Sequence, residues 1–301
     1  MKYISVIIVT YNSEKHIYDC LESLFKNNDI GESLEVIVVD NCSQGFEEMQ
    51  RQIFDLYSDK VVVISNTKNG GYGQGNNVGI RAAIAPIIMI MNPDVRMCEP
   101  VFNMVYNRFD NDNKVVMYSL TQRNELGELG RSTSWSNRIY PYISEPLRYV
   151  TGKLNIYLQK YMYFSGACFF VRKSSFEKVG MFDDNIFMYN EEDDIHSRLL
   201  KLEGAKFIYD RRHYYIHLHH SVTDYGIETH DWLKYNLDSL IYFNERDGIS
   251  RKKTIKWAIK RTNISIWSEQ FKRLFGRGNE ERITYFKKWR EIQKDFLKQL
   301  I

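Results

Sequence analysis

No stretch of this sequence is long and apolar enough to cross a bilayer. The longest apolar run has ten residues, from Ala82 to Met91, and Pro86 interrupts it, whereas a membrane-spanning helix needs roughly 20. The apolar stretch before Thr10 is likewise too short for the hydrophobic region of a secretory signal. We therefore expect a cytoplasmic protein without a transmembrane helix.

Cysteine is scarce, and its spacing carries no metal or disulfide signature. The four cysteines are far apart in the sequence, with no CxxC pair: Cys20, Cys42, Cys98 and Cys168. This argues against a disulfide scaffold or a zinc ribbon and fits a reducing compartment. The hydrophobic fraction of 44% and the charged fraction of 26% exclude a disordered or collagen-like chain. The 301 residues suit one large domain or two smaller ones.

Positive charge is concentrated near the C-terminus. Residues 251–301 contain 15 Lys/Arg and 5 Asp/Glu, a net charge of +10, while the preceding residues carry −7. Large apolar side chains lie among these basic residues: Trp257, Trp267, Phe271, Leu274 and Trp289. Such a segment could lie on an anionic membrane surface, where each basic residue contributes about 1 kcal/mol. It could equally be an amphipathic helix packed on the rest of the protein. The acidic remainder argues against nucleic acid binding.

The first 95 residues alternate between strand and helix patterns. Short apolar runs predict strands buried on both faces at 6–9, 36–39, 61–64 and 87–91. Helical apolar spacing predicts helices at 17–25, at 46–57 and from near Gly75. Further along, we expect strands at 115–120 and 161–171, then helices from Ser174, up to Leu202 and beyond Tyr225. The fold class is therefore α/β, with an open parallel sheet whose ligand lies beyond the carboxyl ends of the strands.

Polar residues stand at two of these strand ends. Asp40 follows the second strand and could accept hydrogen bonds from a ribose or a base, or merely cap the next turn. Asn92 and Asp94 follow the fourth strand, where oxygen ligands could hold a hard divalent cation that a diphosphate completes. The alternative for this pair is an ordinary Asn-Pro turn.

A glycine-rich segment, Asn69 to Asn77, follows the third strand. Its four glycines within six residues predict exposed backbone N–H groups that a phosphate-bearing ligand can approach. A dinucleotide fingerprint would follow the first strand, so this segment is not one. A flexible connection between strand and helix is the alternative.

An acidic segment and a histidine cluster complete the candidate chemistry. Four carboxylates, residues 191–194, open a predicted helix, and the periodicity of its apolar residues places Glu192 on the buried stripe. Burying a carboxylate costs free energy unless the group has a partner or a function, and we therefore take Glu192 as the candidate base. Asp194 and Arg198 have the spacing of a helix-supporting ion pair. Four histidines follow, of which we expect one to reach a metal: His213, His217, His219 and His220.

Taken in order, these motifs resemble family 2 glycosyltransferases of the GT-A fold. The resemblance covers roughly the first 225 residues through Ser5–Asn12, Val38–Asn41, Asn69–Asn77, Met91–Asp94, Ser165–Ala167, Val179–Asp183, Glu191–Arg198 and His217–Ser221. The Asn-Pro-Asp motif and the acidic helix resemble the rhamnosyltransferase-like branch, which builds bacterial surface polysaccharides. The implied fold is a Rossmann-like, mainly parallel sheet flanked by helices, with residues 1–225 as the catalytic domain and 226–301 as a helical extension.

The resemblance also implies residue roles. It assigns the metal, Mg²⁺ or Mn²⁺, to Asp94 and His217, with His219 and His220 as open alternatives. It assigns the base to Glu192, with Glu191 as the second candidate. The nucleotide sugar would contact Thr10, Tyr11, Asp40, Asn69, Gly71, Tyr72, Asn76, Asn92 and Asp94.

The implied activity is an inverting, metal-dependent hexosyl transfer. The donor would be a nucleotide-diphosphate sugar, dTDP-rhamnose or a UDP-hexose, and the acceptor a hydroxyl of a glycan or lipid-linked oligosaccharide. The protein would work in the cytoplasm, peripheral to the inner face of the cell membrane. The competing hypothesis is a non-catalytic relative that binds a nucleotide sugar or glycan.

Overall fold

The computed structural model describes residues 1–218, 229–276 and 278–299. The chain forms two compact units. The first comprises Met1–Ser134 and Tyr157–Gly226, and the second comprises Trp135–Ile156 and Ile227–Ile301.

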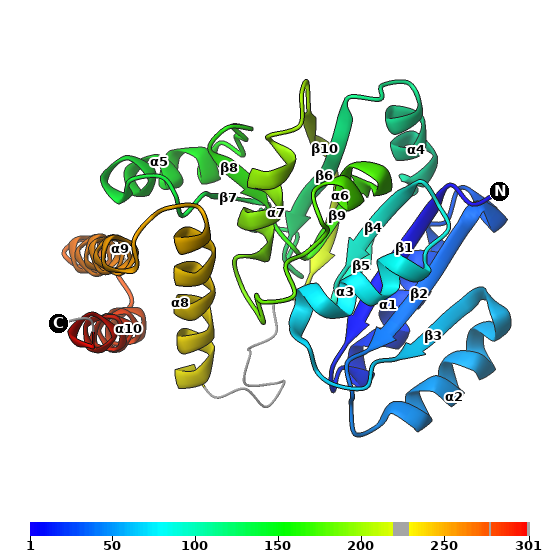
Figure 1. Ribbon diagram of the computed structural model, residues 1–301, viewed down its shortest axis with the longest axis horizontal. Helices are drawn as coiled ribbons and strands as arrows, with labels where there is room; N and C mark the ends of the chain where they lie inside the picture. Colours follow the sequence, from blue (N-terminus) through cyan, green and yellow to red (C-terminus); the bar gives the residue numbers. More distant parts are fainter. Residues whose placement is uncertain (219–228, 277, 300–301) are drawn as a thin grey trace. The chain divides into compact units, whose positions relative to one another are not determined.

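An eight-stranded sheet forms the centre of the first unit (Figure 1). Its order is β3-β2-β1-β4-β9-β6-β10-β5. The strands are β1 (Ile4–Thr10), β2 (Leu34–Asp40), β3 (Val61–Ser65), β4 (Ile87–Met91), β5 (Val95–Met97), β6 (Val115–Arg123), β9 (Cys168–Arg172) and β10 (Lys206–His217). The pairs β1–β2, β2–β3, β1–β4 and β6–β10 are parallel, whereas β9 and β5 run antiparallel to their neighbours. The predicted α/β class is confirmed, with two strands reversed in an otherwise parallel sheet.

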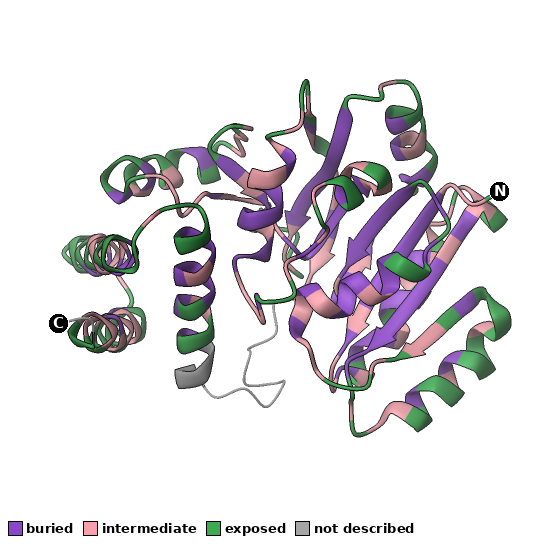
Figure 2. Cartoon of the chain, viewed as in Figure 1, coloured by how far each residue is buried: buried purple, intermediate pink, exposed green. Residues whose placement is uncertain are grey.

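Helices cover both faces of this sheet, as the buried strands in Figure 2 reflect. On one face a continuous core joins the sheet to α1 (Glu14–Lys26), α2 (Phe46–Tyr57) and α4 (Phe102–Asp110). On the other face the core includes α3 (Gly71–Ala82), α6 (Lys173–Lys178) and α7 (Glu191–Leu199). Two short 3₁₀ turns, Gly31–Ser33 and Ser58–Lys60, precede β2 and β3. Because both faces are covered, β4 is apolar and buried along its whole length, and β1 and β2 are largely so, as the apolar runs predicted. The strands toward the other end of the sheet, such as β10, carry charged and partly exposed residues.

The glycine-rich segment is helix rather than loop. Helix α3 begins at Gly71, not near Gly75, and the glycines within it are buried. A Cβ atom at Gly75 would lie 2.7 Å from Asn41 Oδ1, and one at Gly79 would lie 2.5 Å from Ile7 Cγ2. The glycines therefore let α3 lie close against the sheet. The expectation of an exposed, phosphate-cradling loop was wrong for these positions.

The strand predicted at 161–171 is two strands. Met162–Phe164 (β8) pairs with Thr133–Trp135 (β7) in a separate two-stranded sheet, and β9 begins only at Cys168. The break falls at Ser165–Ala167, where the Ser165 backbone N–H donates to Ser132 O at 2.9 Å. This break places residues 165–167 beside the carboxyl end of β4, because Met91 pairs with Cys168.

The described residues of the second unit form four helices: α5 (Pro141–Lys153), α8 (Thr229–Arg246), α9 (Arg251–Arg273) and α10 (Glu280–Lys298). Ser250 and Asn279 cap α9 and α10 by accepting backbone N–H groups of Lys253 and Arg282. Between these two helices the Thr262 hydroxyl bonds Gln293 Oε1 at 3.0 Å. Among the described residues, no helix has the length and apolarity that crossing a membrane requires.

Candidate functional site

The carboxyl ends of β1, β2 and β4 meet at one edge of the sheet. Thr10 pairs with Asp40 across β1 and β2, and β4 ends at Met91 on the other side of β1. The sequence-predicted residues Thr10, Asp40, Asn92 and Asp94 therefore share this edge. An edge of this kind is where open α/β sheets bind ligands.

Asp40 is fully buried and is one of the residues that line a cleft of about 620 Å³. Its Oδ1 accepts hydrogen bonds from the Thr10 hydroxyl at 3.1 Å and the Ser43 hydroxyl at 2.5 Å, and its Oδ2 accepts the Ser43 backbone N–H at 2.8 Å. A carboxylate offers about four lone-pair sites, so one is left for a ligand donor. Tyr11 is half-buried beside this pair, and its backbone N–H donates to Ser13 Oγ at 3.3 Å.

The start of α3 is fixed to the sheet and to the chain before α7. Asn69 Oδ1 accepts the Gly71 backbone N–H at 3.0 Å, and Gly71 O accepts the Asn41 amide at 2.9 Å. Gly71 has φ +86°, and a Cβ there would lie 1.8 Å from Phe187 O, so only glycine fits. The next residue, Tyr72, donates its backbone N–H to the same Phe187 oxygen at 3.1 Å.

Gly166 joins Tyr72 to the acidic helix. The Tyr72 hydroxyl donates to Gly166 O at 2.6 Å, and burial, followed by the charge of Glu192, raises the Tyr72 pKa well above its ordinary value. Tyr72 is therefore held as a proton donor. On the other side, the Gly166 backbone N–H bonds the Glu192 carboxylate. A Cβ at Gly166 would lie 2.0 Å from Glu192 Oε1, so the absence of a side chain is what admits this carboxylate.

The acidic helix buries its carboxylates differently from the prediction. Glu191, Asp193 and Asp194 are 2%, 1% and 1% exposed, whereas Glu192 is only half-buried. The prediction placed Glu192 on the buried stripe, but its three acidic neighbours are more deeply buried than it is, because the first turn of α7 is enclosed on more than one side. Glu191 packs against α3, where a Cβ at Gly73 would lie 3.8 Å from Glu191 Cγ. The predicted pair of Asp194 with Arg198 is confirmed at 2.5 Å.

The backbone just before α7 has an unusual conformation that sets the direction of the first turn of this helix. Tyr189 and Asn190, just before α7, have φ +71° and +70°, a left-handed conformation that is costly for non-glycine residues and clusters at functional sites. Burial, then the charge of Glu192, raises the pKa of Glu191 well above its ordinary value. Burial also raises the pKa of Glu192, although backbone N–H groups, including that of Gly166, oppose it. Glu192 is thus the accessible carboxylate of raised basicity, and Glu191 the enclosed one.

Asp94 and His217 come together across β5 and β10. His217 pairs with Val95 in the ladder, and its Nε2 lies 3.2 Å from Asp94 Oδ2. Asn92 is half-buried, and its backbone N–H donates to Ala167 O at 2.8 Å. A carboxylate and an imidazole at the sheet edge suit Mg²⁺ or Mn²⁺ when ligand oxygens complete the shell. Within the described part of the chain, no third His, Cys, Asp or Glu joins them. His219 and His220 lie outside the described residues, and His213 instead bonds Asp210 at 2.7 Å.

Two buried polar atoms of the predicted site residues lack a hydrogen-bond partner. Asn76 Oδ1 and Glu191 Oε1 are among several such side-chain atoms in the described residues. Asn76 is 1% exposed, and its amide nitrogen donates to Tyr72 O at 2.9 Å. An unpaired buried oxygen costs free energy unless a ligand or water supplies a donor.

The structure adds residues to which the sequence gave no role. Ser43 holds Asp40, Asn41 anchors α3, and Gly166 receives Glu192. The sequence signals for Gly166 are its place in the Ser165–Ala167 motif of the resemblance, to which no role was given, and its interruption of an aromatic stretch, Tyr161 to Val171.

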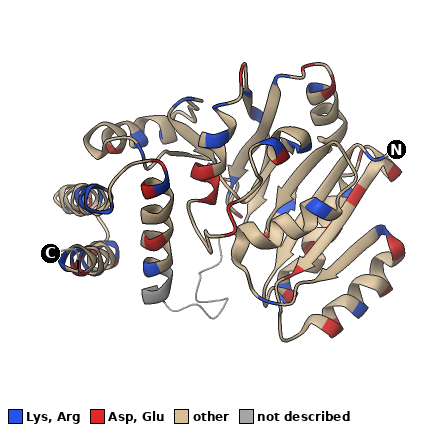
Figure 3. Cartoon of the chain, viewed as in Figure 1, with Lys and Arg blue, Asp and Glu red and all other residues tan. Residues whose placement is uncertain are grey.

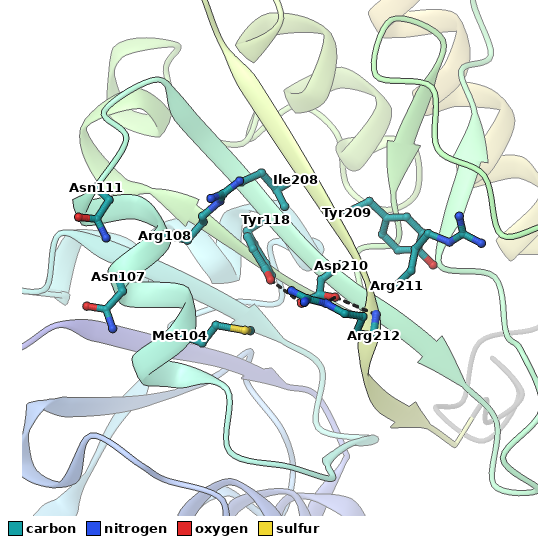
Figure 4. A pocket seen from close by; sticks show the side chains of 10 residues that line it. All are labelled: Met104, Asn107, Arg108, Asn111, Tyr118, Ile208, Tyr209, Asp210, Arg211 and Arg212. Carbon is teal, nitrogen blue, oxygen red and sulfur yellow. Dashed lines mark hydrogen bonds and ion pairs between the residues drawn. The ribbon is translucent and has the colours of Figure 1, made fainter.

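A second cleft, of about 510 Å³, lies between α4 and β10, away from these strand ends (Figure 4). Its centre is Asp210, which accepts the Tyr118 hydroxyl at 2.7 Å and the Arg212 backbone N–H at 2.8 Å. The register of β10 against β6 shifts between Asp210 and Tyr214, so residues 211–213 bulge from the ladder. Figure 4 shows Arg108 reaching the same cleft from α4. None of the predicted site residues lines it.

The fold, with polar residues at the carboxyl ends of its strands, is that of the GT-A class of proteins. The model of glycosyl transferase family 2 matches residues 5–180, and the chain belongs to this family. It is 26% identical over 193 residues to the low-salt glycan biosynthesis hexosyltransferase Agl10 of Haloferax volcanii, covering 63% of this chain and 59% of that protein. It is 37% identical over 93 residues to the poly(ribitol-phosphate) beta-N-acetylglucosaminyltransferase TarS of Staphylococcus aureus, covering 30% of this chain and 16% of TarS. The chain thus spans less than two thirds of either relative.

Solved structures share the fold at low identity. The mannosyltransferase PcManGT from Pyrobaculum calidifontis, in complex with GDP-Man and Mn²⁺, aligns with TM-score 0.60 at 14% identity over 98% of this chain and 84% of its own. S. aureus TarS 1–349 in complex with UDP aligns with TM-score 0.54 at 15% identity, over 98% and 92% of the two chains. These likenesses confirm the predicted GT-A fold.

Proposed function

We propose that this protein is an inverting glycosyltransferase that moves a hexose from a nucleoside-diphosphate sugar to a hydroxyl of a glycan or lipid-linked acceptor. The observation that carries the proposal is Glu192, which is half-buried and held by the Gly166 backbone. We assign it to one site with Asp40, Asp94 and His217, because Gly166 is followed by Ala167, whose carbonyl accepts the Asn92 N–H beyond the end of β4. A base of raised pKa beside a nucleotide pocket and a cation site is what sugar transfer from a diphosphate requires.

The reaction assigns one task to each group. Glu192 takes the proton of the acceptor hydroxyl as its oxygen attacks the anomeric carbon from the face opposite the diphosphate. The new glycosidic bond forms as the bond to the diphosphate oxygen breaks, and that oxygen keeps the electron pair. The configuration inverts because attack and departure occur on opposite faces. A raised pKa strengthens Glu192 as a base near neutral pH.

The remaining residues bind and orient the donor. The free acceptor position of Asp40 suits an N–H of the nucleotide base, and Asn76 Oδ1 suits a hydroxyl of the ribose or sugar. We assign Tyr11, Asn69 and Asn92 to the donor site as well. Asp94 and His217 would hold Mg²⁺ or Mn²⁺, which when bound supplies positive charge to the departing diphosphate. The Mn²⁺ in the complex of PcManGT supports the use of a divalent cation by a protein of this fold.

The donor and the setting follow from chemistry and relatives. Curated relatives are named as a hexosyltransferase, an N-acetylglucosaminyltransferase and a glucosyltransferase, so we propose a hexose donor, UDP-linked or, as in the rhamnosyltransferase-like branch, dTDP-rhamnose. Relatives of glycan and teichoic acid synthesis favour a surface polysaccharide acceptor. We place the reaction at the inner face of the cell membrane.

One observation favours a second candidate, a non-catalytic subunit that binds a nucleotide sugar. Asn92 stands where a second carboxylate would strengthen a cation site, and no third ligand joins Asp94 and His217 in the described residues. Turnover separates the two candidates, because a binding subunit releases no nucleoside diphosphate.

The test is nucleoside diphosphate release from a panel of UDP-, dTDP- and GDP-sugars by the wild type and two variants. Glu192→Gln removes the base but keeps the shape, and we expect turnover to fall about 10²–10⁴-fold with donor binding retained. Glu203→Gln, the same substitution at an exposed glutamate, is the matched control and should not change turnover. Release by Glu192→Gln at the wild-type rate would refute the base, and no release by the wild type with any donor would favour the binding subunit.

A further inference from the structure

One face of α9 changes from basic to aromatic along its length. Lys256 and Lys260 occupy its N-terminal half, and Trp267 and Phe271 its C-terminal half. At 100° per residue these four side chains fall within an arc of about 60°. Figure 3 shows the basic residues of this unit along α9 and α10.

The aromatic half is exposed and continuous. Trp267 is 66% exposed, Phe271 50%, and two residues of the following turn, Leu274 and Phe275, 79% and 66%. The Trp267 and Phe271 rings stack with centroids 5.8 Å apart, and Phe271 meets Phe275 at 5.2 Å. Four contiguous large apolar side chains left open to solvent are unusual for a surface and indicate a contact that the chain alone does not make.

Helix α5 extends this surface beside Lys260. The Lys260 ammonium lies 5.3 Å from the ring centroid of Tyr140 and 5.6 Å from that of Tyr142. From there an exposed stripe follows α5 at i, i+4, i+7 and i+11: Ile143 (55%), Leu147 (41%), Val150 (48%) and Leu154 (54%). The apolar face of this amphipathic helix therefore points to solvent rather than into the unit.

The net charge of the second unit favours one kind of partner for this surface. The segments of the second unit contain 20 Lys/Arg and 11 Asp/Glu, a net charge of +9, whereas the first unit carries 21 and 27, a net of −6. A second copy meeting this face through the same face would bring like charges together. An anionic lipid surface instead attracts the basic residues and accepts Trp, Phe and Leu at its headgroup boundary.

We propose that the surface formed by Tyr142 and the stripe of α5, Lys256 and Lys260, and the aromatic end of α9 binds an anionic lipid bilayer. Trp267 and Phe271 enter the headgroup boundary, and the basic half of α9 lies on the lipid phosphates. The proposal concerns the second unit alone and holds whether or not the first unit transfers a sugar.

Cosedimentation of the full chain with lipid vesicles tests it. The probes are vesicles of phosphatidylglycerol mixed with phosphatidylcholine, and vesicles of phosphatidylcholine alone. We expect the wild type to bind the anionic vesicles, to bind the neutral ones weakly, and to dissociate as salt is added. Trp267→Ser with Phe271→Ser should lower the partition coefficient by at least about tenfold, because the variant lacks the two apolar rings that would be buried at the headgroup boundary.

The matched control is Phe54→Ser with Leu56→Ser, which removes two side chains of similar exposure, 64% and 62%, from α2 of the first unit. It should bind vesicles as the wild type does. Since all four positions are exposed, both variants should keep the unfolding midpoint of the wild type. Equal sedimentation of the Trp267/Phe271 variant and the wild type would overturn the proposal. So would a wild-type dimer that this variant dissociates without any vesicle binding, because the face would then join two copies. Nucleotide-induced stabilisation, measured without vesicles, tests the transferase separately.

Discussion

Substituting Gly166 by alanine places one methyl group between the two segments that position the proposed base. The new Cβ would lie 2.0 Å from Glu192 Oε1 and 2.8 Å from its Cδ. Gly166 is not among the glycines with positive φ, so alanine adds no backbone strain there. The substitution therefore acts through the displaced carboxylate.

The distance by which the Glu192 carboxylate is displaced determines how far turnover falls. Carbon and oxygen atoms settle at about 3.5 Å, so the Glu192 oxygen must move by roughly 1 Å or more. A misplacement of about 1 Å costs a positioned catalytic group roughly 10²-fold in rate. We expect turnover to fall about 100-fold with donor affinity little changed, and the free energy of unfolding to fall by about 1–3 kcal/mol.

The assay is steady-state nucleoside diphosphate release, read beside urea unfolding. Gly152→Ala is the matched control, since Gly152 is a helical glycine of α5 with no atom within 4 Å of its added Cβ. That variant should keep wild-type turnover and gain roughly 0.5–1 kcal/mol of stability. A Gly166→Ala protein with wild-type turnover would show that the carboxylate held by Gly166 is not the base.

Two further predictions concern stability. Gly71→Ala should cost more than about 3 kcal/mol, because φ is +86° and the Cβ meets Phe187 O at 1.8 Å; Gly31→Ala, with φ +53° and nothing within 4 Å, should cost only about 1–2 kcal/mol. Similar losses in urea unfolding would refute the close approach. At Asp210, burial opposes ionisation, but hydrogen bonds from Tyr118, Arg212 and His213 outweigh it and hold the pKa below its ordinary value. Such a group stabilises above the unfolded pKa of about 4 and loses that contribution as pH falls through the folded pKa. Asp210→Asn should thus cost about 1–3 kcal/mol at neutral pH and progressively less in acid; a cost independent of pH would contradict this.

The sheet and most helices could be predicted because their signals are local. Unbroken apolar runs such as 87–91 predict strands, and the spacing of Ile17, Cys20 and Leu24 predicts α1. The reversal of β9 and β5 and the helix α5 could not be predicted, because strand direction and partners depend on contacts between distant segments. The prediction of an exposed loop at the glycines of α3 failed for the same reason. The sequence does not distinguish a glycine that exposes its backbone to a ligand from one that lets a neighbouring segment pack closely.

In the candidate site, too, features that depend on local sequence could be predicted and those that depend on distant contacts could not. The strand-end residues Asp40 and Asp94 could be predicted from their positions alone, and the resemblance supplied His217 as a partner of Asp94, which the 3.2 Å contact supports. The burial of the acidic helix could not be predicted from the sequence. Helical periodicity assumes that only one side of a helix is buried, whereas Glu191, Asp193 and Asp194 are all buried. The role of Gly166 depends on a contact between residues 26 positions apart, which no local pattern encodes.

The most direct test of the central claim, a metal-assisted nucleotide-sugar site at the sheet edge, is thermal stabilisation by UDP, dTDP and GDP, each with and without Mn²⁺. A ligand at a hundredfold excess over its dissociation constant adds about 2.7 kcal/mol to the stability. The account predicts that one nucleotide raises the melting temperature, that Mn²⁺ enlarges the shift, and that Asp94→Ala removes the part due to Mn²⁺. No shift with any nucleotide, or an unchanged Mn²⁺ effect in Asp94→Ala, would contradict it.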